Sequence, residues 1–351
     1  MTGWCPAYQL PDWPAESPYG SRAWMLAWRQ VRTEPVHETR FLPAEPVIAP
    51  FYLVSDSPAW DAFEAEAGVD RVWPGRVIFC PSPYATYGLH VTSPEQIRAI
   101  VARGLAWARE TGAVAAVFPG LREPGIWTDA AAGGIAVRTT GSHEAPVRGS
   151  VEAFQGAIHS KRGRKEFGRQ WRRGADAGLR LAVRHGAEMT PFLPTFTTLA
   201  RAAAERHGVA LYDLDVFRAV AQVPGAVLLA AEHGRDLAGA FLALRHGHTL
   251  YLWAAGLDYG SLHDLHTYSW LFAESVKYAA ANGLVMIDAG RGNYLVKRRM
   301  GFTQVPLHAL CYLSNPDPAL AAALTEMGRR IAVASAISES EPAVAAVGSM
   351  P

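Results

Sequence analysis

The sequence predicts a two-domain α+β protein in which mixed, largely antiparallel sheets are flanked by helices. The first observation is length, because 351 residues, 50% of them hydrophobic, exceed what one ordinary core needs. The second is a succession of helix-spaced and strand-like segments without strict alternation. The third is a set of three apolar runs in residues 226–257, separated by the turn formers HGRD and HGH, which is typical of an antiparallel meander.

In the first half, apolar spacing predicts helices at 20–31 and 92–112. Ser21 is the expected N-cap of the first helix. The second is bounded by Ser93 as N-cap, with a proline directly after it, and by Gly112 at its end. Three further segments of this half predict strands: 47–54, 76–82 and 113–120.

The second half begins with one long predicted helix, 150–178, capped by Ser150 and ended by Gly178. After it we expect a strand at 179–186, helices at 190–208 and 214–225, the meander, a helix at 263–283, and strands at 284–290 and 303–314. One more helix follows from 315, and 338–351 reads as a loose tail. The predicted domains are therefore 1–149 and 150–315, followed by a C-terminal helix and tail at 316–351.

The composition argues for a soluble cytoplasmic protein. The N-terminus lacks the basic start and apolar run of a signal peptide, and no apolar stretch approaches the ~20 residues that span a bilayer. Cys5, Cys80 and Cys311 are far apart and odd in number, so neither a disulfide framework nor a CxxC metal site is indicated.

Positive charge is concentrated in one segment, 161–173. It holds seven basic residues and one acid, Glu166, so its net charge is +6 in a protein whose total is +1. On a helix, most of these bases share one stripe, whereas Phe167 and Trp171 lie on the opposite side and can anchor the helix. A solvated surface and an anionic lipid surface are two interpretations of this stripe. We favour a third, a nucleic-acid contact through Lys161, Arg162, Lys165, Arg169, Arg172 and Arg173.

Residues 250–302 contain a series of short motifs. An aromatic strand (YLW, 251–253) leads to an LH pair at 262–263 and a long helix. A strand ending at Asp288, a glycine-containing loop, Lys297 and a GF pair at 301–302 follow in that order. In this order the motifs resemble the FemAB-like, peptidoglycan biosynthesis or recognition branch of the GNAT acyltransferase superfamily. The resemblance implies tandem GNAT-like halves, the second carrying the active cleft. It also implies an activity, the transfer of an aminoacyl group from aminoacyl-tRNA to an amine.

One motif of CoA-dependent GNAT enzymes is missing. Between the meander and the next helix, the sequence reads GLDYGSLHDLH instead of R/Q-x-x-G-x-G/A, whose backbone N–H groups hold the pyrophosphate. We therefore expect no bound cofactor, with aminoacyl-tRNA as a co-substrate and tRNA and a small amine as partners. A CoA-dependent N-acyltransferase and a non-catalytic recognition protein of the same fold are the alternatives.

By this resemblance, the catalytic candidates are Asp288, His263 and Lys297. Asp288 would orient the amine or act as a base, or else cap a loop or pair with Arg291; Lys297 would meet a phosphate or developing charge, or else lie on the surface. His263 would act as a base, or else cap a helix; with His266 it has metal-like spacing but no third ligand, so no metal is expected.

The remaining candidates are substrate-binding residues. Aromatic side chains near the strand and helix could line a pocket, although such residues are more often core. The glycine-containing loop could approach a ligand closely, or else be a simple turn. The substrate-binding candidates are Tyr251, Trp253, Tyr268, Arg291 and Asn293.

Overall fold

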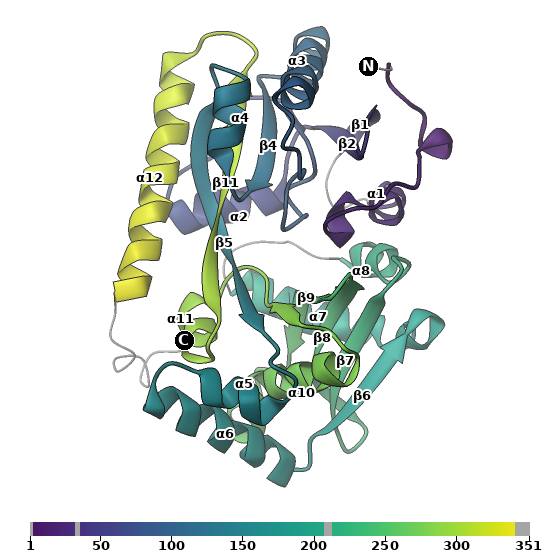
Figure 1. Cartoon of the computed structure of the whole chain (residues 1–351), viewed down its shortest axis with the longest axis vertical. Coiled ribbons are helices and arrows are strands. Elements are labelled where there is room, and N and C mark those ends of the chain that lie inside the picture. The colour runs from purple at the N-terminus through teal and green to yellow at the C-terminus, as the bar shows by residue number, and fades with distance from the viewer. Residues whose placement is uncertain (1–2, 32–35, 207–212, 341–351) are drawn as a thin grey trace. The chain divides into compact units, whose positions relative to one another are not determined.

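The computed structural model describes residues 3–31, 36–206 and 213–340. Its backbone forms two compact units (Figure 1). The main parts of the first are Met1–Thr140 and Pro306–Ala336, and those of the second are Gly141–Arg206 and Tyr212–Val305. The first unit includes the last strand from Pro306 on and the C-terminal helix as far as Ala336.

In the first unit, the strands follow the order β1-β2-β3-β4-β11, with β3 and β4 parallel and the other neighbours antiparallel. The strands are β1 (Val36–Ala44), β2 (Val47–Val54), β3 (Val77–Phe79), β4 (Ala115–Leu121) and β11 (Thr303–Leu313). The helices are α1 (Arg22–Trp28), α2 (Pro58–Ala67), α3 (Pro94–Thr111), α4 (Pro124–Ala130) and α12 (Pro318–Ser340).

Helix α3 packs on this sheet where the chain has a glycine. A Cβ on Gly104 would lie 2.9 Å from the ring of Phe51, so the absence of a side chain lets the helix approach β2. The predicted ends of α3 are confirmed: the Ser93 hydroxyl accepts a hydrogen bond from the N–H of Gln96, and Gly112 adopts a left-handed φ of 67°.

In the second unit, the strands follow the order β5-β10-β9-β8-β7-β6, with β9 and β10 parallel and the other neighbours antiparallel. They are β5 (Ile135–Pro146, here from Gly141 on), β6 (Arg180–His185), β7 (Ala226–His233), β8 (Asp236–His246), β9 (Thr249–Leu257) and β10 (Met286–Asp288). Both units thus have mixed, largely antiparallel sheets flanked by helices, so the predicted fold class and the meander β7–β9 are confirmed.

Helices cover both faces of this second sheet (Figure 1). The helices α5 (Val151–Ala157), α6 (Lys161–Asp176) and α10 (Thr267–Ala281) lie on one side, where Leu250, Leu252 and Ile287 join their core. Helices α7 (Leu193–Glu205) and α8 (Leu214–Val220) lie on the other. Two short helices, α9 (Leu262–Leu265) and α11 (Tyr294–Arg299), flank α10 and β10 in the sequence.

The single helix predicted over 150–178 is wrong, because the chain forms α5 and α6 with a break at Ile158–Ser160. Ile158 is buried, and its non-helical backbone (φ −58°, ψ 123°) carries the chain out of α5. The Ser160 hydroxyl then caps α6 by accepting from the N–H of Gly163, and Arg164 donates to the carbonyls of Ile158 and His159. The N–H of Gly163 and the carbonyls of Ile158 and His159 therefore have hydrogen-bond partners at the break.

Helix α6 packs tightly on α10 through its apolar side. A Cβ on Gly174 would lie 2.7 Å from the indole of Trp270, and Trp171 Nε1 donates to Glu274 Oε1 at 2.9 Å. Phe167 is 3% exposed, so it anchors the helix as predicted. The basic stripe consequently faces outward.

Candidate functional site

Strands β9 and β10 separate in the second unit. They pair only from Met286–Thr249 to Asp288–Tyr251, after which β10 ends and β9 continues to Leu257 beside β8. Within the part of the chain described, no strand pairs with the other edge of residues 252–257. Such a splay leaves backbone groups that a substrate can bond, because peptide N–H and C=O groups need partners.

Asp288 lies at the point of separation, 2% exposed. Its Oδ1 accepts from the hydroxyl of Ser142 at 2.6 Å and from the N–H of Gly290 at 2.7 Å. In the strand register Asp288 lies opposite Tyr251 of β9, and its neighbour Ile287 faces the α10 core. The carboxylate therefore points to the other face of the sheet.

The loop after β10 turns sharply. Gly290, Gly292 and Asn293 all have left-handed φ angles, between 53° and 71°. A Cβ on Gly290 would lie 3.0 Å from the carbonyl oxygen of Leu252, so the loop crosses β9 closely, as only glycine permits. The predicted close approach of this loop thus involves the protein's own strand.

Lys297 reaches back from α11 into the loop. It is 3% exposed, and its Nζ donates to the carbonyls of Gly290 at 3.1 Å and Arg291 at 2.7 Å. Burial lowers the pKa of Lys297 from its ordinary value of 10.5 to about 7, although Asp288 opposes this shift. The structure thus brings Asp288, Lys297 and Arg291 together, and Lys297 is a buried residue.

Two polar residues of this centre were not predicted: Ser142 and His143, from β5. Both are at most 1% exposed, and His143 Nδ1 lies 3.4 Å from the carbonyl oxygen of Gly290. Burial and then Lys297 lower the pKa of His143 to about 3, so its imidazole is neutral at physiological pH. The signal for them was the polar run TTGSHE at 139–144, which is unusual in an interior strand.

Among the substrate-binding candidates, Tyr251, Tyr268 and Asn293 lie near the strand end and loop of Asp288, whereas Trp253 packs against another helix. The Asn293 amide donates to the hydroxyl of Tyr268 at 3.2 Å, so α10 and the loop meet there, and burial raises the pKa of Tyr268. Tyr251 is buried beside Asp288. Trp253 packs edge-on against Phe217 of α8, at 6.1 Å between ring centres, which is a core contact.

His263 lies apart from this centre. It is exposed on α9, and the described residues include no hydrogen bond or ion pair between His263 and Asp288 or Lys297. Its electrostatic neighbour is His266, whose pKa is lowered by burial and then by Arg173 and Arg169 of α6. The structure therefore places His263 on the side of the basic helix.

On α6, most basic side chains stand in solvent without bonds. Arg169 pairs with Glu166 at 2.5 Å, and Gln170 also donates to that carboxylate. Burial alone would raise the pKa of Glu166, but Arg169 and Gln170 outweigh it and the pKa is lowered. An open hollow on the helix is lined by residues of this stripe, Glu166 included. The exposed bases with no hydrogen bond or ion pair to any residue described are Lys161, Arg162, Lys165, Arg172 and Arg173.

The turn between β9 and α9 is occupied by a carboxylate. Asp258 accepts from the N–H of Gly260 at 3.0 Å and from the hydroxyl of Ser261 at 2.5 Å. In CoA-dependent GNAT enzymes this turn offers backbone donors to a pyrophosphate; in this chain the Asp258 carboxylate already accepts from one backbone donor, the N–H of Gly260. An anionic side chain in this position disfavours a second anion.

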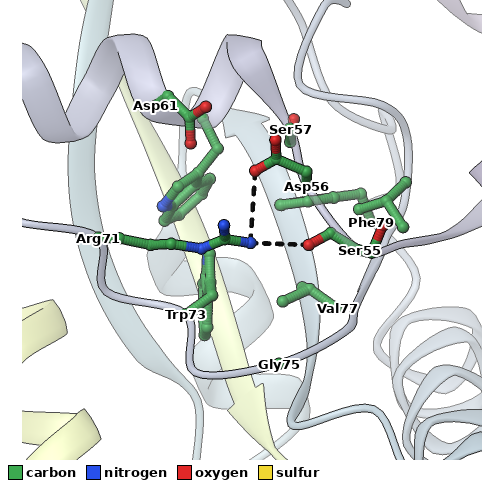
Figure 2. Close-up of a pocket in the computed structure, with 11 residues that line it drawn as sticks. Ser55, Asp56, Ser57, Asp61, Arg71, Trp73, Gly75, Val77 and Phe79 are labelled. Carbon is green, nitrogen blue, oxygen red and sulfur yellow. Dashed lines mark hydrogen bonds and ion pairs between the residues drawn. The ribbon is translucent and has the colours of Figure 1, made fainter. Parts of the chain in front are cut away.

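The first unit has a small pocket, of about 10 Å³, that is lined by none of the predicted site residues (Figure 2). Arg71 crosses it, donating to the carbonyl of Ser55 at 2.7 Å and pairing with Asp56 at 3.3 Å. Burial and then Asp56 raise the pKa of Asp61, while Arg71 opposes this shift. The arginine is therefore already bonded within the pocket.

The described residues contain neither a metal-binding cluster nor a helix suited to crossing a membrane. No group of three or more His, Cys, Asp or Glu side chains in residues 3–31, 36–206 and 213–340 is arranged to hold a metal ion. Over the same ranges, none of the helices combines the length and apolar character that crossing a bilayer requires.

Comparison with known proteins agrees with this geometry. Residues 161–298 match the family model described as an acetyltransferase (GNAT) domain. The chain has the fold of GNAT acyltransferases. This agrees with the strand splay at β9 and β10, and with the resemblance noted in the sequence. No curated protein sequence matched the chain.

Solved structures extend the likeness over most of the chain. FemX is 10% identical, with a TM-score of 0.58, covering 86% of this chain and 93% of FemX. L-PGS from Bacillus licheniformis is 10% identical, with a TM-score of 0.53, covering 85% of this chain and 90% of L-PGS. A conserved protein of unknown function from Bacteroides thetaiotaomicron is 9% identical, with a TM-score of 0.53 and coverages of 83% and 89%. At these identities the shared property is the fold.

Proposed function

We propose that this protein forms an amide bond by moving an aminoacyl group from aminoacyl-tRNA to a small amine, such as a cell-wall precursor or a natural-product intermediate. The observation that carries the proposal is the row of exposed, unbonded cations on α6, in the same unit as the buried Asp288 centre. Cations without protein partners can bind the phosphates of an RNA, and their contribution is independent of base sequence.

The reaction is an aminolysis of an ester. The amine nitrogen attacks the aminoacyl carbonyl carbon, the carbonyl oxygen becomes negatively charged, and the bond to the ribose oxygen then breaks. The proton lost by nitrogen passes to that ribose oxygen, giving an amide and a free tRNA hydroxyl. Asp288 would orient the amine and accept its proton, because it stands at the splayed strand end where both substrates could meet.

The donor is the point on which the alternatives differ. Acyl-CoA is disfavoured because the turn between β9 and α9 carries the Asp258 carboxylate, which accepts from the Gly260 N–H and the Ser261 hydroxyl and would repel a pyrophosphate. His263 lies on α9, next to His266, whose pKa is affected by Arg173 and Arg169 of the basic helix. In this proposal His263 therefore belongs to the RNA-binding surface and does not act on the reacting carbonyl. The same cations would otherwise remain a solvated surface.

The test is a transfer assay with a pool of tRNA charged with radiolabelled amino acids and a mixture of primary amines. Label that survives mild alkali reports an amide, because alkali cleaves the starting ester. A parallel reaction supplies acyl-CoA in place of charged tRNA. Alkali-stable product only from the tRNA reaction supports the proposal, and product only from the acyl-CoA reaction replaces it.

A further inference from the structure

Lys297 directs the backbone of the loop that precedes α11. Its Nζ donates hydrogen bonds to two successive carbonyls, those of Gly290 and Arg291, so both carbonyls point to the buried amine. In a trans peptide unit the N–H points opposite to the C=O. The N–H of Gly292, which shares a peptide unit with the Arg291 carbonyl, therefore points away from Lys297.

That N–H has no partner in the part of the chain described, because Gly292 donates to no acceptor there. Gly292 is half-buried, and a Cβ placed on it would meet nothing within 4 Å, so the side of the residue where a side chain would stand is open. A backbone donor fixed in this way is the type of group that stabilises an oxyanion, since it needs no rearrangement when charge develops.

The other end of the loop is fixed by Asp288. The Ser142 hydroxyl and the Gly290 N–H both bond to Oδ1 of Asp288, and Ser142 is completely buried. The proposed amine-orienting carboxylate and the Gly292 donor therefore belong to one segment of five residues. Their spacing is set by Ser142 on one side and by Lys297 on the other.

We propose that the N–H of Gly292 stabilises the oxyanion of the transfer reaction, and that Lys297 and Ser142 are positioning residues that aim the loop without touching the reacting atoms. The inference rests on the proposed function. It identifies the donor to the carbonyl oxygen and assigns the buried lysine an indirect role.

The decisive experiment compares Gly292→Ala with Gly283→Ala. Both glycines have left-handed φ angles, 71° and 67°, and both have open space where the new Cβ would lie, so the two variants suffer similar backbone strain. Gly283 lies past the end of α10, outside the loop. Alanine keeps the N–H, but the left-handed φ of 71° is strained for it, so the peptide unit at 292 should rotate and turn that N–H away from the oxyanion. We therefore expect kcat for transfer from charged tRNA to fall about 10²-fold in Gly292→Ala with little change in KM, and to stay near wild type in Gly283→Ala, where no donor is displaced.

Equal kcat values in the two variants would overturn the inference while leaving the proposed function intact. If Lys297 acted directly on the substrate, Gly292→Ala would retain activity, since it leaves the lysine in place. Failure of the wild-type protein to transfer any aminoacyl group would instead refute the proposed function.

A second measurement does not depend on activity. Hydrogen–deuterium exchange of residues 289–293 should accelerate at least about 10-fold in Lys297→Met, because the loop loses both of its carbonyl contacts. Exchange in α7 serves as the internal control and should not change. Unchanged exchange in the loop would show that Lys297 does not position it, and would overturn that part of the inference.

Discussion

Two regions of the second unit differ in how their basic side chains are placed: most of those on α6 are exposed, and that of Lys297 is buried. On α6, five cations stand in solvent with no hydrogen bond or ion pair to the residues described. In the centre at β10 and α11, the side-chain amine of Lys297 is buried and donates to two carbonyls. The first arrangement leaves charge available to a ligand, whereas the second uses the hydrogen bonds of an amine to hold the backbone.

The difference shows that burial decides what a basic side chain does. An exposed cation acts over about a Debye length and is weakened by salt. A buried amine acts through short contacts that salt does not screen, and burial lowers its pKa. Added salt should therefore weaken ligand binding at α6 and leave the contacts of Lys297 unchanged.

The largest effect is expected from Asp288→Asn. Asn keeps an Oδ1 acceptor for Ser142 and Gly290 but removes the charge, so kcat for aminoacyl transfer should fall ~10²–10⁴-fold with the loop still in place. The measurement is steady-state kinetics with charged tRNA, together with thermal unfolding. The matched control is Asp258→Asn, whose carboxylate likewise accepts from a backbone N–H and a serine hydroxyl. Wild-type kcat in Asp288→Asn would exclude its charge from the mechanism.

Next in size is charge reversal on α6. Lys165→Glu combined with Arg169→Glu should weaken tRNA binding by at least about 10-fold near 0.1 M salt, because phosphate contacts are lost and the new acids repel RNA. The slope of log affinity against log salt should also become shallower. Arg180→Glu with Arg201→Glu is the control, since both arginines are exposed in the same unit, on β6 and α7. Equal losses in the two double variants would mean that α6 is not the RNA surface.

A smaller effect, of opposite sign, is expected from Glu166→Gln. Glu166 is the only acid within 161–173 and neutralises Arg169, so its removal should tighten tRNA binding about 2- to 5-fold. Glu152→Gln, at an exposed position on α5, removes the same charge nearby and should change binding less. Filter binding across a salt series measures both, and a weaker complex for Glu166→Gln would contradict the phosphate model.

Stability should depend on pH through Lys297. The pKa of Lys297 is about 7 in the folded protein, against 10.5 when unfolded, so between these values the unfolded chain holds a proton that the folded chain lacks. The free energy of unfolding therefore gains a contribution that increases with pH from about 7 to 10.5. Urea unfolding at pH 7 and pH 9.5 should show a larger gain for wild type than for Lys297→Met. Equal gains would mean that the lysine is not held in a neutral form.

The sequence by itself determined the local structure of much of this chain. Caps and glycines defined α3, turn formers defined the meander β7–β9, and charge counting identified the basic segment, because each signal is contained in a few neighbouring residues. The GNAT resemblance came from the order of short motifs. The interior strand β5 was missed, because its polar run TTGSHE hides the apolar pattern of a buried strand.

Only the tertiary structure decided which residues share a site. Ser142 and Asp288 are 146 positions apart and meet because β5 and β10 are neighbours in the sheet. Lys297 is buried because α11 folds back over its own loop, and His263 lies apart because α9 carries it to the side of α6. Contacts of this kind depend on strand order and helix packing, which a local pattern of residues does not encode.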